Sequence, residues 1–252
     1  MQAILFIFIN FFVAYPLLAA PTAAEPTAEE LISGMENLMW GKTTHTNFSM
    51  TIKTQYWERK LELEAWLDRP QKTLIRIHAP KKEKGVGSLR IGGEMWNYIP
   101  KIDRTIKIPP SMMLQPWMGS DFSNDDLVKE SSMIDDYRHE ISGSYIEKGK
   151  TIFRVISIPN PDAPVVWGKL EFLIYSDFIP LEQAFFDEAG KLVKVMKYSD
   201  IREIGGRTIP VRWRMLPAEK PDQFTEIVVD DIGFDMPLSN DLFSLRSLRN
   251  PQ

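Results

Sequence analysis

The chain has 252 residues, of which 44% are hydrophobic and 25% are charged, and this composition excludes a disordered or fibrous protein. Its formal net charge of −4 lacks the basic excess of a nucleic-acid-binding protein, so we predict no nucleic-acid partner. It contains no cysteine, which excludes disulfides and a lipid-modified N-terminal cysteine, and a packed core must therefore hold the fold.

The first 24 residues differ in composition from the rest. An almost wholly apolar run from Ile4 to Val13 precedes a stretch of small residues that ends at Ala24. The apolar run is shorter than the roughly 20 residues that span a bilayer, and its order is typical of a secretory signal peptide. We predict a signal peptide over 1–24, with a retained N-terminal anchor as the alternative. The mature chain, 25–252, is then a single periplasmic domain.

An amphipathic helix is predicted near the start of the mature chain, over Thr27–Trp40. Thr27 and Glu30 have the spacing of a capping box, in which each side chain binds the backbone N–H of the other residue. Apolar residues then recur at helical spacing from Leu31 to Met39. The pattern predicts one buried face and one face in water.

From Phe48 onward, apolar and polar residues alternate with a period of two, which predicts antiparallel strands with one buried and one wet face. The first runs are Phe48–Tyr56, Leu61–Leu67 and Ile75–Ile77. The further predicted strands are Ser88–Ile91, Met95–Ile99, Arg104–Ile108, Arg138–Ile146, Thr151–Ile158, Lys169–Tyr175, Pro180–Phe186, Val193–Asp200, Arg207–Leu216 and Phe224–Gly233. Short helices are predicted to begin at Ser123 and near Ser239. The fold class is therefore mainly β with a few helices (α+β).

A sheet of about a dozen strands cannot leave its apolar face in water, so it must close, pack on a second sheet or be covered by helices. A curled sheet under a helical cover tends to leave a hollow, and ligand sites favour such concave apolar spaces. The predicted inward-facing lining is Met50, Ile52, Leu61, Leu63, Ile75, Ile77, Leu170, Phe172 and Ile174.

The segment Pro109–Met118 could complete such a cavity. It places Met112, Met113 and Trp117 between prolines, and methionine suits surfaces that adapt to flexible apolar ligands. The alternative is that these residues only plug the sheet. Trp96 and Tyr98 are candidates for the cavity mouth, with a place in the core as their alternative.

Four arginines lie in the first half of the predicted sheet. We expect them on a solvated strand face, with contact to a lipid headgroup or an acidic partner as the alternative; they are Arg69, Arg76, Arg90 and Arg104. If Leu61 and Leu63 face inward, Trp66 faces outward, which weakly favours a partner surface there.

No catalytic arrangement is recognisable. The histidines His45, His78 and His139 lack metal-site spacing, and there is no nucleophile elbow, phosphate loop or cysteine nucleophile. The acidic residues after the Met-rich segment lack calcium-loop spacing and are expected to be solvated acids at helix starts; they are Asp121, Asp125, Asp126, Asp135 and Asp136. We predict no enzyme, cofactor or metal, and a hydrolase with two distant carboxylates stays open as a lesser alternative.

Several of these residues resemble a known family. Trp66, Arg69-Pro70, Trp96-Asn-Tyr98-Ile-Pro100 and above all MGSDFSNDDL, from Met118 to Leu127, resemble the outer membrane lipoprotein-sorting proteins of the LolA-like (lipoprotein carrier) superfamily. The resemblance covers nearly all of the mature chain. It implies an open antiparallel half-barrel of about 11–12 strands, covered on its concave face by helices and a loop. It also implies a periplasmic location, an acyl-chain cavity and no catalysis.

The resulting hypothesis is a periplasmic carrier or chaperone that binds lipid or lipoprotein acyl chains for transport to, or sorting at, the outer membrane. Further expected partners are an inner-membrane transporter of the RND or ABC type or an outer-membrane acceptor. The segments Thr27–Trp40 and Pro109–Met118 are the candidates for movement during release. The alternative is an interaction or sensor module that works with an envelope transporter and carries no lipid.

Overall fold

The computed structural model describes residues 25–128, 133–163 and 165–250, and the predicted signal peptide lies outside these residues. The helices are α1 (Ala28–Met39), α2 (Asn124–Val128), α3 (Met133–Asp136) and α4 (Leu245–Arg249). Single 3-10 turns occur at η1 (Pro100–Ile102), η2 (Pro110–Met112), η3 (Trp117–Gly119) and η4 (Asn240–Leu242). The strands are β1 (Thr43–Lys53), β2 (Glu58–Asp68), β3 (Lys72–Ala79), β4 (Gly87–Ile91), β5 (Glu94–Ile99), β6 (Arg104–Ile108), β7 (Tyr137–Glu147), β8 (Lys150–Pro159), β9 (Lys169–Tyr175), β10 (Pro180–Phe186), β11 (Leu192–Ile204), β12 (Arg207–Pro217) and β13 (Phe224–Phe234).

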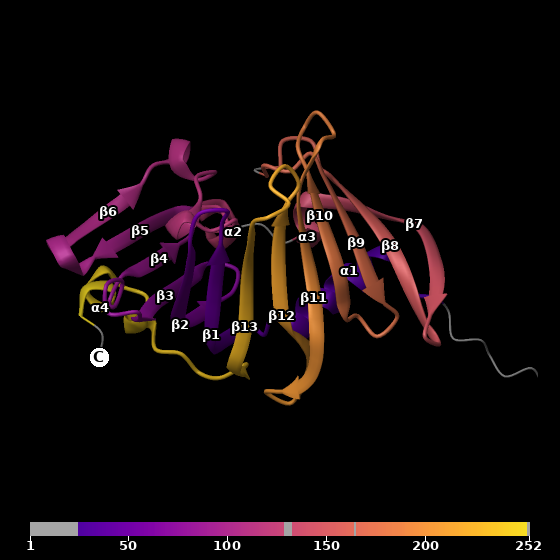
Figure 1. The fold of residues 1–252 in the computed structure, drawn as a ribbon. Coiled ribbons are helices and arrows are strands. Elements are labelled where there is room, and N and C mark those ends of the chain that lie inside the picture. The colour runs from indigo at the N-terminus through magenta and orange to yellow at the C-terminus, as the bar shows by residue number, and fades with distance from the viewer. Residues whose placement is uncertain (1–24, 129–132, 164, 251–252) are drawn as a thin grey trace, which may run out of the picture.

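All the described strands join one antiparallel sheet in the order β6-β5-β4-β3-β2-β1-β13-β12-β11-β10-β9-β8-β7 (Figure 1). Two successive meanders, β1–β6 and β7–β13, meet where β1 pairs with β13. The sheet stays open because β6 and β7 lie at its two edges, and the predicted open half-barrel is thereby confirmed. It has 13 strands instead of the predicted 11–12, since every predicted run, including the short β4 and β6, pairs in the sheet.

The period-two alternation separates the two faces of the sheet as predicted. In β1, every second residue from Thr44 to Ile52 is buried, and the residues between them are partly exposed. All nine residues predicted to face inward are buried in the main core, so their orientation is confirmed.

Helix α1 packs on the inner face of the sheet and shares its core (Figure 1). The predicted capping box is present, with Thr27 Oγ1 accepting from the Glu30 N–H at 3.1 Å and Glu30 Oε2 accepting from the Thr27 N–H at 2.8 Å. Gly34 allows close packing, because a Cβ there would lie 2.5 Å from the Phe178 ring. Beyond the helix end, the Arg207 guanidinium donates to the Asn37 carbonyl at 2.6 Å. This cation satisfies a carbonyl at the negative end of the helix dipole.

The opposite, outer face carries a second apolar cluster that the C-terminal segment covers. Leu74 and Leu89 from the sheet pack against Phe243 and Leu248, while η4 and α4 lie beside this half of the sheet (Figure 1). Gly87 makes this fit possible, since a Cβ there would lie 2.7 Å from Leu248 Cδ1. The short helix predicted near Ser239 is only the 3-10 turn η4, and α4 was not predicted.

Trp66 faces outward as predicted, and it packs against this second cluster. Its ring lies 5.2 Å from the His45 ring in a stacked arrangement, and the Arg76 guanidinium lies 5.3 Å from its centre. The chain's own C-terminal segment therefore covers part of the surface that Trp66 was expected to offer to a partner.

Two of the four arginines expected on a solvated face are buried, which corrects that prediction. Arg76 is 7% exposed and donates to Ser247 Oγ at 3.0 Å, because α4 covers this face. Arg90 is 5% exposed and faces inward, where it donates to the Gly92 and Pro70 carbonyls of two neighbouring turns. Arg104 is exposed, as expected.

Candidate ligand-binding cavity

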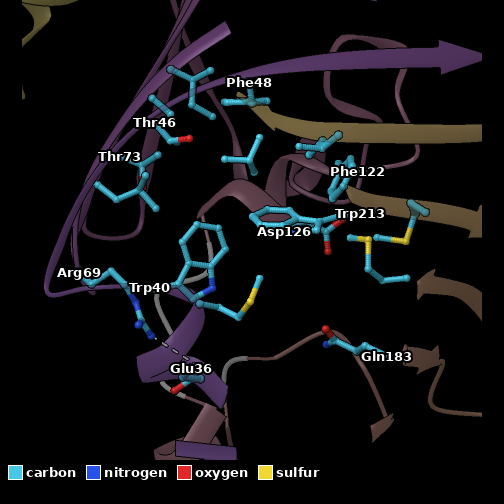
Figure 2. A pocket seen from close by; sticks show the side chains of 18 of the residues that line it. Glu36, Trp40, Thr46, Phe48, Arg69, Thr73, Phe122, Asp126, Gln183 and Trp213 are labelled. Atoms are coloured by element: carbon cyan, nitrogen blue, oxygen red, sulfur yellow. Dashed lines mark ion pairs between the residues drawn. The ribbon is translucent and has the colours of Figure 1, made fainter. Parts of the chain in front are cut away.

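A cavity of about 300 Å³ lies between the inner face of the sheet and its cover (Figure 2). Most of its lining is apolar. The lining residues are Met35, Glu36, Met39, Trp40, Thr46, Phe48, Met50, Ala65, Leu67, Arg69, Pro70, Lys72, Thr73, Ile75, Arg90, Trp117, Phe122, Asp126, Met133, Pro180, Gln183, Phe185, Met196, Tyr198, Trp213, Met215, Ile227, Val229 and Ile232.

Three adjacent strands build part of the floor in register. Thr46 of β1 pairs with Ala65 of β2, and Ala65 pairs with Ile75 of β3, so the three side chains stand side by side on the inner face. The small Ala65 side chain leaves space that a leucine or isoleucine would fill.

Aromatic residues and methionines form the walls. The Trp40 and Trp213 rings meet edge to face at 5.3 Å, and the Trp213 indole N–H is satisfied by the Pro210 carbonyl at 2.7 Å. The Tyr198 hydroxyl donates to Gln183 Oε1 at 3.3 Å. Burial raises the pKa of Tyr198, so its phenol is neutral and suits an apolar space.

The MGSDFSNDDL stretch closes one side of the cavity. Phe122 enters the lining, while Ser123 caps α2 by accepting from the Asp126 N–H at 3.1 Å. The Asn124 side chain donates to the Met112 carbonyl at 2.9 Å. The bond from Asn124 fastens the Met-rich segment to the motif, and this role in the cover explains the value of the motif as a signal.

Asp126 is not a solvated helix-cap acid, which corrects that prediction. It lines the cavity and pairs with Lys194 at 2.5 Å, with side-chain exposures of 12% and 7%. The Lys194 ammonium also lies 4.9 Å from the Trp167 ring centre. The α2 turn directs the carboxylate inward, and Lys194 shares its strand face with Met196. Strand parity could have identified Lys194, but nothing in the sequence links it to Asp126.

Asp121 is half-buried, so it is not fully solvated either. Its carboxylate accepts from Thr225 Oγ1 at 2.7 Å. Burial raises its pKa, and the hydrogen bond from Thr225 opposes this shift. The backbone N–H of Asp121 also donates to Thr225 Oγ1, at 2.9 Å, so this residue fastens the motif to β13.

A looser ion pair lies at another side of the cavity. Arg69 and Glu36 lie 3.6 Å apart, with side-chain exposures of 28% and 16% (Figure 2). Figure 2 shows this pair beside Trp40 and away from Phe122 and Asp126. We call four of the partly or fully exposed lining residues, Glu36, Trp40, Arg69 and Pro70, the mouth.

Of the residues predicted to bind ligand, Met50, Ile75 and Trp117 line the cavity. The Trp117 indole N–H donates to Ser88 Oγ at 2.9 Å, which holds this side chain in the interior. The others in the main core but outside the lining are Ile52, Leu61, Leu63, Ile77, Leu170, Phe172 and Ile174, and Met113 packs partly against them. Whether any of these residues contacts a ligand stays a prediction.

Three predicted site residues lie elsewhere. Trp96 and Tyr98 pack against the outer-face cluster. Successive residues of a strand point to opposite faces, so Met95 faces inward while Trp96 and Tyr98 face outward. Met112 is 45% exposed, and only its backbone carbonyl accepts from the Asn124 side chain. These residues do not belong to the cavity.

The histidines do not converge on the cavity. His45 and His78 each place Nε2 2.8 Å from the Glu64 carboxylate. Among the described residues, no group of three or more His, Cys, Asp or Glu side chains is arranged to hold a metal ion. Within the same part of the chain, no helix is both long and apolar enough to span a membrane.

A family model described as "uncharacterized protein" matches residues 69–250. The chain belongs to this family. No curated protein sequence matches the chain at a significant level.

Solved structures show which fold the family member has. A DUF1329 family protein from Desulfovibrio piger is 19% identical, with a TM-score of 0.78 over 88% of this chain and 97% of that one. A LolA superfamily protein from Nitrosomonas europaea is 17% identical, with a TM-score of 0.74 over 88% and 99%. A domain assigned as an outer membrane lipoprotein-sorting protein from Vibrio parahaemolyticus is 20% identical, with a TM-score of 0.74 over 88% and 98%. The chain therefore has the LolA-like fold, and the resemblance seen in its sequence is confirmed.

Proposed function

We propose that the protein is a non-enzymatic periplasmic carrier or chaperone that holds acyl chains of a lipid or lipoprotein in the cavity. The observation that carries the proposal is the largely apolar space of about 300 Å³ between the sheet and its cover. The name of the Vibrio parahaemolyticus relative, a lipoprotein-sorting domain, supports the same reading.

Burial of an acyl chain supplies enough free energy for a carrier. Each methylene moved from water contributes about 0.8 kcal/mol, so about ten methylenes give roughly 8 kcal/mol before the cost of ordering the chain. The methionines of the lining, including Met35, Met39 and Met196, can adapt to a flexible chain.

Delivery requires release, so part of the cover must move or a partner must compete for the cargo. Helix α1 and the segment Pro109–Met118 are our candidates, because both form the cover and neither belongs to the sheet. An inner-membrane transporter or an outer-membrane acceptor is the proposed partner for loading or release.

The test is native mass spectrometry of the protein purified from the periplasm without detergent, followed by solvent extraction. We expect a bound species with the mass of a lipid or an acylated peptide. The Ile75→Asn variant, which places a polar group in the floor, should lose this species. Ile106→Asn, at an exposed position on β6, is the matched control and should retain it.

A clean apo mass, with no uptake of added lipid, would contradict the carrier proposal. It would favour the second candidate, a docking or sensor module for an envelope transporter. That candidate has its own support in the β1–β2 turn, where Tyr56 and Trp57 are 85% and 44% exposed. Loss of transporter co-purification after Tyr56→Ser and Trp57→Ser substitution would then identify the docking surface.

A further inference from the structure

Three cationic residues line the cavity, and the side chains of two of them already donate hydrogen bonds to other parts of the protein. Lys72 Nζ donates to Asp68 at 3.2 Å and to Asn240 at 2.8 Å. Arg90 donates to the carbonyls of two turns, Gly92 and Pro70. Neither side chain is available to a ligand without breaking these contacts.

Arg69 differs from both. A guanidinium has five N–H donors in a fixed fork. Within the described part of the chain, the Arg69 guanidinium pairs with the Glu36 carboxylate at 3.6 Å and makes no side-chain hydrogen bond. Its backbone is fixed by an N–H bond to the Lys42 carbonyl at 2.9 Å. A positioned cation with free donors therefore lies at the mouth of an apolar cavity.

The cavity volume limits what lies behind this cation. A volume of about 300 Å³ is at the lower end of ligand pockets. So small a volume favours one acyl chain over the two or three chains of a larger lipid.

We propose that the cavity takes a single-chain amphiphile whose anionic head group, a carboxylate or phosphate, binds Arg69 in competition with Glu36. The inference rests on the proposed function and names the cargo class. The head group would receive bidentate, charge-assisted hydrogen bonds that the 3.6 Å contact with Glu36 does not provide. Asp126 and Lys194, on another side of the cavity, neutralise each other. Arg69 is thus the specificity-determining residue.

The experiment measures displacement of a bound fluorescent fatty acid from the mature protein at fixed salt. The competitors share one chain length and differ in the head group: dodecanoate, dodecyl phosphate, dodecanol and dodecylammonium. We expect both anions to bind more tightly than dodecanol, and dodecylammonium to bind most weakly. Inorganic phosphate, which has no tail, should not displace the probe.

Substitutions separate the head group from the tail. In Arg69→Gln, affinity for the anions should fall by about tenfold to a hundredfold, the range for hydrogen bonds to a charged group, while that for dodecanol stays unchanged. Glu36→Gln should raise anion affinity, because it removes the competing carboxylate. The matched control is Arg104→Gln, an exposed arginine of β6, which should change nothing. Thermal melting confirms that each variant is folded.

The outcomes distinguish the two proposals. Equal binding of all four head groups, or an equal loss for dodecanol in Arg69→Gln, would overturn the head-group inference and leave the carrier proposal intact. Displacement by phosphate alone, abolished in Arg69→Gln, would assign a site for free anions instead. Binding of none of the amphiphiles would overturn the carrier proposal and the inference with it.

Discussion

Both faces of the sheet carry apolar residues that other segments of the chain cover, but the two covers fit differently. On the outer face, the C-terminal segment covers Leu74 and Leu89, and Leu248 fits so closely that Gly87 has no room for a Cβ. On the inner face, α1 and the motif segment cover a larger apolar area and leave a cavity of about 300 Å³. The cavity therefore results from a looser fit of the inner cover to the sheet.

The comparison separates stability from binding. Residues under a closely fitting cover have packing partners on every side. Residues that line a cavity lack partners on the side that faces the empty space, so they contribute less to stability. The outer face should therefore govern stability alone, and the inner face should govern ligand uptake. Four predictions follow this division, in order of decreasing effect.

The outer cover is tested by Leu248→Ala. Leu248 is buried against the outer cluster, so its truncation should lower the free energy of unfolding by about 2–4 kcal/mol. Denaturant titration measures the loss, and ligand affinity should stay unchanged in the folded protein. Leu245→Ala, at a position of the same helix that is 44% exposed, is the control and should cost little. A large loss of affinity in Leu248→Ala would show that the two faces are coupled.

The inner cavity is tested by Ala65→Leu. The added carbons enter the floor between Thr46 and Ile75, so uptake of an acyl chain should weaken at least tenfold, about 1.4 kcal/mol. The free energy of unfolding should change by less than about 1 kcal/mol, because the side chain fills existing space. Calorimetric titration and denaturant titration give the two quantities. Ala218→Leu, at an exposed position, serves as the control. Strong destabilisation would mean that the floor at residue 65 has no free space.

The attachment of the inner cover is tested by Arg207→Ala. The substitution removes the donor to the Asn37 and Leu38 carbonyls at the end of α1 and should cost about 1 kcal/mol of stability. Hydrogen exchange should rise first in the last turn of α1. The control is Arg202→Ala, whose exposed pair with Asp200 contributes little. Unchanged exchange in α1 would place the attachment of the helix elsewhere.

The smallest effect is a pH dependence at His139. Its Nδ1 lies 2.7 Å from Ser157 Oγ and its Nε2 lies 3.0 Å from the carbonyl of Met133, a cavity residue. Burial lowers the pKa of His139 from its ordinary value of 6.5, although the Met133 bond and Glu29 oppose the shift. The unfolded chain then binds a proton more readily, so stability is complete above pH 6.5 and falls as the pH drops through that value.

The expected loss at His139 is below about 1 kcal/mol, because the site is only half-buried and solvent screens it. The difference in melting temperature between pH 7.5 and pH 5.5 should be smaller in His139→Gln than in the native protein. An equal pH dependence in both proteins would assign the effect to other groups.

Local patterns predicted most of the fold. The alternation of β1 and the Thr27–Glu30 capping box each depend on neighbours in sequence, and both were found as predicted. The parity of Met95 against Trp96 was also readable, and it would have favoured a place in the core over the cavity mouth for Trp96 and Tyr98. The pair of Asp126 with Lys194 could not be predicted, since it joins separate elements through tertiary packing. The same holds for the burial of Arg76 under α4, because no local pattern shows which face the C-terminal segment covers.

The order of strands has a consequence for how the protein folds. Every neighbouring pair within β1–β6 and within β7–β13 is consecutive in sequence, except across the single junction of β1 with β13. Each meander can thus assemble by short hairpin closures, whereas the junction must bring together nearly the two ends of the described chain. Closing so long a loop costs conformational entropy before any contact repays it, and non-local pairings fold slowly. We therefore expect two fast, hairpin-driven halves and one late step, in which β1 and β13 join them and enclose the cavity.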